Sequence, residues 1–147
     1  MNKEKTIEAI VNARKAHENQ MKKIESLLKG KEVDNPTAAL KTECEFGKWL
    51  YDDNSHLKDI LGSIFYNNLE SLHARWHIEY LRVFEIFFKP KKKGFFSKAF
   101  GSNKIDEMEF DKAKLYYSEL ESTTNELLKV IASSQRRLEA LREEKFY

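Results

Sequence analysis

Apolar residues recur along this chain at alternating steps of three and four positions, the spacing that gives an α-helix one apolar face. The first such stretch predicts an amphipathic helix from about Lys3 to Lys29. Its inward-facing stripe consists of Ile7, Ile10, Arg14, His17, Met21, Ile24 and Leu28. His17 is therefore expected to face the interior. Gly30 and the sequence Asp34-Asn35-Pro36 then end the helix.

Two further helices are predicted in the middle of the chain. One runs from about Thr37 to Tyr51, and the other follows the Asp52-Asp53-Asn54-Ser55 break, from about Lys58 to Phe88. Gly47 lies inside the shorter helix and costs it about 1 kcal/mol relative to Ala, which indicates that another group approaches the backbone there. The apolar side of the longer helix carries Leu69, Leu72, His73, Trp76, His77, Tyr80, Val83, Phe84 and Phe87.

A final long helix is predicted from about Ile105 to Lys145. At 1.5 Å per residue it would measure roughly 60 Å, against roughly 40 Å for the first helix, so we expect it to bend, divide or project beyond the others. The Lys- and Phe-rich loop before it, residues 89–104, has five lysines and no acidic residue between Lys89 and Lys98. Phe95, Phe96 and Phe100 would suit a membrane surface, but we favour a solvated insertion whose aromatic rings fold back onto the helices.

Four amphipathic helices without a convincing strand or repeat predict an all-α fold, specifically an antiparallel four-helix bundle. The 147 residues suffice for one domain. We therefore expect a single domain over residues 1–147, with a motif region at 7–88, the basic loop at 89–104 and the C-terminal helix at 105–145.

The composition narrows the function. The 26 basic and 24 acidic residues leave a net charge of only +2, which argues against a nucleic-acid binder. No stretch approaches the roughly 20 apolar residues of a membrane span, and the N-terminus does not have the pattern of a secretory signal. A single cysteine, Cys44, excludes an internal disulfide and favours a reducing, cytoplasmic setting.

Four side chains could hold a metal ion. His73 and His77 stand four residues apart, so both imidazoles lie on one helix face. Cys44 and His17 are predicted to point inward from two other helices. Three imidazole nitrogens and one thiolate form the tetrahedral set that Zn²⁺ prefers. The alternative from the residues alone is that these histidines are hydrogen-bonded core residues.

The sequence Cys44-Glu45-Phe46-Gly47-Lys48-Trp49 resembles the Cys-x-Phe/Leu-Gly-x-Trp element of the chemoreceptor zinc-binding (CZB) domain family. In that family a histidine precedes this element and His-x-x-x-His follows it. His17, and His73 with His77, occur in that order here. The chain departs from the family at Gln20, where an aromatic or aliphatic residue is usual.

The resemblance implies that His17, Cys44, His73 and His77 bind zinc in a cytosolic, helical sensory domain of the kind found on bacterial chemoreceptors and diguanylate cyclases. In some relatives the zinc thiolate is also thought to respond to oxidants. Nothing in the chain resembles a receptor signalling hairpin or a cyclase domain, so we expect the stand-alone form, with output through a homodimer or a signalling partner.

Two other functions remain to be weighed. The first is a structural or protein-interaction bundle in which zinc only staples the core. The second is an enzyme, which we do not expect, because four protein ligands leave no vacant position for the water that catalytic zinc requires. That position would open only if His17 were not a ligand.

Overall fold

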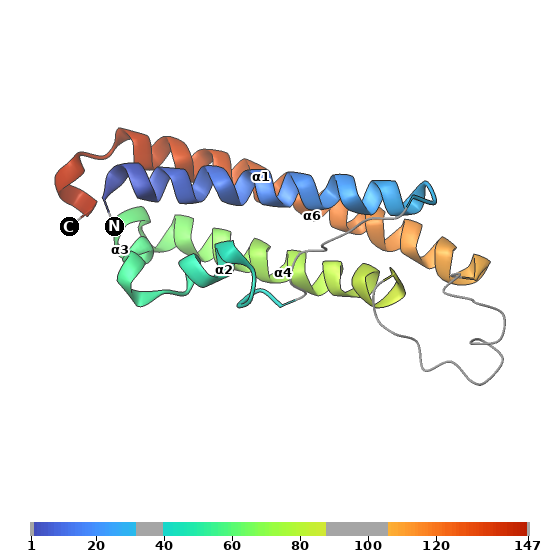
Figure 1. Cartoon of the computed structure of the whole chain (residues 1–147). Coiled ribbons are helices and arrows are strands. Elements are labelled where there is room, and N and C mark those ends of the chain that lie inside the picture. Colours follow the sequence, from blue (N-terminus) through green and yellow to red (C-terminus); the bar gives the residue numbers. More distant parts are fainter. Residues whose placement is uncertain (1, 32–39, 88–105, 147) are drawn as a thin grey trace.

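The computed structural model describes residues 2–31, 40–87 and 106–146 of the chain (Figure 1). Helices dominate these residues, and no strand occurs among them, so the all-α class is confirmed. The helices are α1 (Lys3–Leu28), α2 (Glu45–Leu50), α3 (Leu57–Leu61), α4 (Ser63–Phe87) and α6 (Glu107–Ala140), with two 3-10 helices, η1 (Asp53–Ser55) and η2 (Glu143–Phe146).

The two helices α1 and α4 both pack against α6, which runs in the opposite direction to each of them (Figure 1). Polar contacts fix this arrangement at one end. Lys3 Nζ donates hydrogen bonds to the carbonyls of Glu139, at 2.9 Å, and Leu141, at 2.7 Å. Arg137 Nε donates to the carbonyl of Leu61 at 2.7 Å. Because α1 and α4 point the same way, the segment between them has to return along the molecule, and α2 lies on that return.

The second predicted helix is shorter than expected. Its first residues fall in 32–39, which lie outside the described residues, and residues 40–44 form bends and turns. The helix begins only after Cys44, whose Sγ caps it by accepting a hydrogen bond from the Gly47 N–H at 3.2 Å. A side chain that bonds the backbone in this way favours a helix start over a helix interior. The prediction of helix before Cys44 is therefore wrong for residues 40–44.

The third predicted helix is divided at Gly62. This glycine has φ +87° and ψ 156°, a conformation open essentially to glycine alone, and it separates α3 from α4. The last helix is shorter than predicted at both ends. Ile105 lies outside the described residues, and α6 begins at Glu107, with the Asp106 carboxylate as its N-cap. It stops at Ala140 because Leu141 is extended, and η2 follows instead of a helix to Lys145.

The interior between the long helices contains both apolar and polar residues. Trp76, Tyr80, Leu69, Leu127 and Ile131 are fully buried, as the stripes predict. His17, His73 and His77 are also buried, each at 4% exposure or less, so their predicted inward orientation is confirmed. The Lys- and Phe-rich loop lies outside the described residues. Within the described helices, none combines the length and apolar character needed to cross a membrane.

Candidate metal centre

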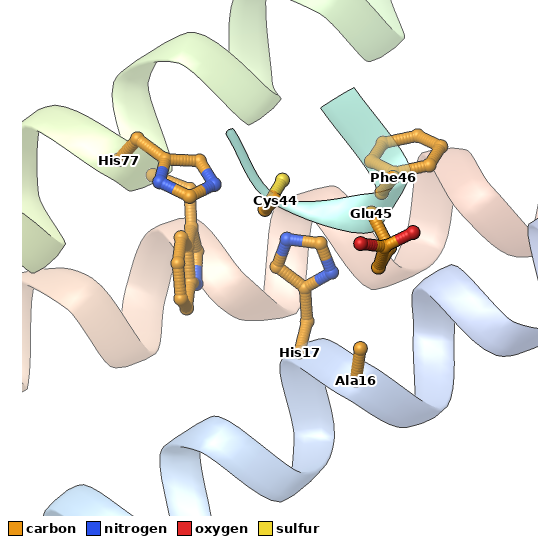
Figure 2. A pocket seen from close by; sticks show the side chains of 7 residues that line it. Ala16, His17, Cys44, Glu45, Phe46 and His77 are labelled. Carbon is orange, nitrogen blue, oxygen red and sulfur yellow. The ribbon is translucent and has the colours of Figure 1, made fainter. Parts of the chain in front are cut away.

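Three buried histidines meet in the middle of the structure. His17, His73 and His77 each offer one ring nitrogen such that these atoms all lie within 4.8 Å of one another. Cys44 belongs to the same cluster, because its Sγ lies 3.3 Å from His73 Nε2. Figure 2 shows His17 on α1, His77 on α4 and Cys44 on the segment leading to α2, with their side chains around one pocket. The structure therefore brings together all four residues singled out from the sequence.

Helical geometry sets the positions of the histidines. His73 and His77 are one turn apart on α4, and their ring centroids are 4.6 Å apart. His17 faces them from the middle of α1, with its ring 5.5 Å from that of His73 and 6.3 Å from that of His77. Because α1 and α4 run side by side in the same direction, a residue near the middle of one helix meets its counterpart on the other.

A backbone hydrogen bond orients the His17 ring. Its Nδ1 lies 2.7 Å from the carbonyl oxygen of Ala13, one turn earlier in α1. A carbonyl can only accept, so Nδ1 carries the proton and Nε2 keeps its lone pair. Metal-binding histidines use the same arrangement, in which the second ring nitrogen donates to a carbonyl and fixes the tautomer. Neutral His17 is thus prepared to offer Nε2 as a ligand.

A tight turn positions the Cys44 sulfur. A Cβ atom on Gly47 would lie only 1.6 Å from the carbonyl oxygen of Lys41, so this position requires glycine. The close approach predicted at Gly47 is confirmed, and the Lys41 backbone makes it. The Gly47 N–H donates to Cys44 Sγ, the kind of contact that stabilises a thiolate. The glycine in the sequence element therefore serves the turn that presents the sulfur.

A small cavity of about 90 Å³ opens at the centre. Trp76 and Phe46 line it with Ala16, Glu45 and the ligand candidates His17, Cys44 and His77. Trp76 is fully buried, and its Nε1 donates to Thr124 Oγ1 at 2.8 Å, which fixes the indole against α6. These aromatic side chains form apolar walls beside the histidines.

Burial favours the neutral forms of His17, His73 and Cys44. It lowers the pKa of His17 from 6.5 to about 4, with the Ala13 carbonyl opposing the shift. It lowers the pKa of His73 to about 2, with the neighbouring His17 and His77 adding to the effect. Burial also raises the pKa of Cys44, and the charge of Glu45 adds to it. Burial is thus a larger cause of the raised thiol pKa than the Glu45 charge.

The residues fit a zinc ion. The 3.3 Å between His73 Nε2 and Cys44 Sγ is close to the separation of two ligands on a tetrahedral zinc, whose bonds are about 2.0–2.3 Å. Neutral imidazoles and a sulfur held by an N–H donor are also the forms in which these residues bind zinc.

Gln20, the departure from the family pattern, is accommodated. It is buried at 2% exposure, and its Nε2 donates to the Tyr80 hydroxyl at 3.1 Å. Gln20 therefore contributes a polar link between α1 and α4 one turn beyond His17. The position that an apolar residue usually fills is packed here by a paired polar side chain.

The sequence analysis missed a second polar cluster beside the centre. Glu70 on α4 accepts hydrogen bonds from Lys41 Nζ, at 3.1 Å, and from the Tyr51 hydroxyl. Burial, followed by the Glu70 contact, raises the pKa of Tyr51, so that its hydroxyl stays a donor. The one available signal was the spacing of Glu70, three residues before His73 and thus on the same helix face.

Comparison with known families agrees with this geometry. Residues 17–83 match the family described as the chemoreceptor zinc-binding domain, CZB. The match supports the resemblance found in the sequence, and it spans all four cysteine and histidine positions discussed above. The cofactor of that family is zinc. No curated protein and no solved structure matches the chain.

We expect Gly47→Ala to damage the centre specifically. The added methyl would overlap the Lys41 carbonyl oxygen, so the turn must open, at a cost of about 1–3 kcal/mol or more. Zinc affinity should fall with it. The control is Gly30→Ala, where no atom lies within 4 Å and only the left-handed φ of +80° adds strain. Denaturant unfolding and zinc titration measure both effects. Unchanged zinc affinity in Gly47→Ala would contradict the role given to the turn.

We expect the zinc-free protein to lose stability in acid. The unfolded chain takes up a proton on His17 near pH 6.5, whereas the folded chain resists protonation down to about pH 4. Acid therefore favours unfolding, and His17 alone contributes on the order of 3 kcal/mol between those two pH values. Denaturant midpoints from pH 7.5 to 4 measure this loss, and His17→Phe should remove the share due to His17, while the lowered pKa of His73 keeps the rest. A zinc-free protein equally stable across this range would contradict the burial argument.

Proposed function

We propose that this chain is a zinc-dependent sensory or regulatory module whose ligands are His17, Cys44, His73 and His77. One observation carries the proposal: three neutral, buried imidazoles and one sulfur, from three separate segments, meet in a single pocket. Hydrogen-bonded core histidines are the competing explanation. They are disfavoured because His73 Nε2 faces the Cys44 sulfur at 3.3 Å, and a thiol is only a weak hydrogen-bond donor and acceptor.

The Cys44 segment depends on its contacts with α1 and α4 to keep its position. α2 is only six residues long, and a helix of that length has little stability alone. Bound zinc would cross-link α1, the Cys44 turn and α4. When the site is empty, the buried imidazoles and the thiol face one another without the compensation that a cation provides. Metal binding is thus coupled to the packing of these segments, and the module senses occupancy as far as the two packings differ in affinity.

Oxidation offers a second input to the same site. Thiolates, unlike neutral thiols, react with oxidants, and burial raises the pKa of Cys44 in the zinc-free protein. Cys44 is therefore protected when free and held as a thiolate when it is a ligand. Conversion of its sulfur to a sulfenic acid would remove the charge that makes it a ligand. The zinc-loaded form is the one we expect to respond.

Binding, rather than catalysis, accounts best for the donor set. Four protein ligands complete a tetrahedral zinc, so no position remains for a substrate or an activated water. The Ala13 hydrogen bond that frees His17 Nε2 supports His17 as the fourth ligand. Output would then pass through a homodimer or a signalling protein in the cytoplasm. The return segment with α2 would stand as the fourth element of one antiparallel bundle domain.

Zinc analysis tests the ligand set. We expect the purified protein to bind about one Zn²⁺ per chain, and Cys44→Ala or the joint replacement of His73 and His77 by Ala to weaken binding at least a hundredfold. Loss of a ligand removes a metal bond and leaves the remaining donors buried without compensation. His56→Ala is the matched control, because His56 is exposed and lies outside the cluster. A wild-type chain that takes up no zinc would overturn the proposal.

Zinc removal separates a sensor from a stapled scaffold. For a sensor we expect chelation to change the oligomeric state or the near-ultraviolet dichroism of Trp76, which lines the cavity. Helix content should change less, because α1 and α4 each pack against α6 independently of the Cys44 turn. A scaffold would lose stability on chelation without a change in oligomeric state or tertiary signal. Size-exclusion chromatography and circular dichroism, with and without chelator, measure these differences.

A further inference from the structure

A network centred on Glu70 joins the Cys44 segment to α4. One carboxylate oxygen of Glu70 lies 3.1 Å from Lys41 Nζ, and the other accepts the Tyr51 hydroxyl hydrogen bond. Lys41 Nζ also lies 5.3 Å from the centre of the Tyr51 ring, within cation–π range. The side chains of Lys41, Tyr51 and Glu70 thus each contact the other two. Two of them come from the segment that carries Cys44, and the third comes from the helix that carries His73 and His77.

The two residues that contact Glu70 lie on either side of Cys44 in the sequence. Lys41 stands three residues before the cysteine and Tyr51 stands seven after it, so Glu70 holds both ends of the turn and of α2. The Lys41 backbone also faces the cysteine, because the Cys44 thiol lies 3.5 Å from the Lys41 carbonyl oxygen. A displacement of Lys41 would therefore move an immediate neighbour of the sulfur.

Among the described residues, other contacts also join this segment to α4, including the Phe46 ring at 4.8 Å from the His73 ring. The Tyr66 hydroxyl donates to the Leu50 carbonyl at 3.3 Å, and His73 Nε2 faces the Cys44 sulfur directly. Tyr66, Glu70, His73 and His77 are spaced by four, three and four residues, so they occupy one face of α4. This face holds the cysteine segment and supplies two ligand candidates. The partly buried Glu70, with a side-chain exposure of 28%, makes the only ion pair on it among the described residues.

We propose that Lys41, Tyr51 and Glu70 are positioning residues that hold the Cys44 sulfur against His73 and thereby set how slowly zinc is released. The proposal rests on the ligand set given above. Residues that orient metal ligands typically change metal affinity by 10–100-fold when they are replaced. The network contacts the segment that carries Cys44. Its loss should therefore free the Cys44 sulfur from the metal before the histidines.

The test compares Glu70→Ala with the wild type. We expect zinc transfer to an excess of chromogenic chelator to be roughly 10–100-fold faster in the variant. With Co²⁺ in place of Zn²⁺, the thiolate-to-metal charge-transfer absorption per bound ion should fall. A purely structural role would reduce the amount of folded protein but leave that absorption per bound ion unchanged.

The chain provides a matched control. Arg82 Nη1 pairs with Glu119 at 3.1 Å, and Arg82 lies 5.6 Å from the Tyr116 ring centre, so this cluster repeats the same interactions between α4 and α6. Glu119→Ala removes an equivalent ion pair far from the Cys44 segment. We expect its zinc release and its cobalt spectrum to match those of the wild type.

Two milder variants keep the test decisive if Glu70→Ala fails to fold. Tyr51→Phe removes one hydrogen bond, and Glu70→Gln keeps an acceptor for Tyr51 but loses the attraction to Lys41. Both should release zinc faster than the wild type, by less than the 10–100-fold expected for Glu70→Ala. Folded variants with wild-type release rates and spectra would overturn the positioning role. If the wild type bound no zinc, or if Cys44→Ala released it at the wild-type rate, the proposed ligand set itself would fail.

Discussion

Everything at the centre of this protein depends on the burial of three imidazoles and a thiol in one small space. Burial lowers the pKa of His17 and His73 and raises that of Cys44, so each group is held neutral where little water reaches it. Such a concentration of polar atoms is unfavourable unless something compensates for the lost water. A divalent cation that binds all four donors is the compensation that fits their chemistry. The burial that makes the zinc-free core unfavourable is also the reason why bound zinc would stabilise the fold.

The donors differ in how firmly the fold holds them. The three histidines lie on long helices, which pack against α6 over much of their length. Cys44 lies at the start of a six-residue helix and depends on a glycine turn and on side chains that reach α4. The Cys44 segment is thus the part of the site whose displacement costs the least free energy. In the proposed sensor, Cys44 would be the movable and redox-active ligand on a rigid helical frame.

Several features of the fold followed from local pattern alone. The three–four periodicity located α1, most of α4 and most of α6, because each of these helices buries one continuous stripe. The order of His17, the Cys44 element and the His73–His77 pair identified the CZB family, and the family match over residues 17–83 confirms it. Periodicity failed around residues 40–44 and at Gly62. There the backbone follows a sulfur cap and a glycine conformation, which have no helical period.

The sequence by itself determined the helical class, the inward orientation of the histidines and the donor types that select zinc, because these follow from spacing and side-chain chemistry. Only the tertiary structure decided how the donors meet: α1 and α4 run in parallel, His17 is oriented by the Ala13 carbonyl, and the Lys41 backbone closes on Gly47. The grouping of Lys41 and Tyr51 around Glu70 was likewise decided at that level. Such contacts join residues far apart along the chain, and a one-dimensional pattern does not record which distant residues the packing of helices brings within a few ångströms.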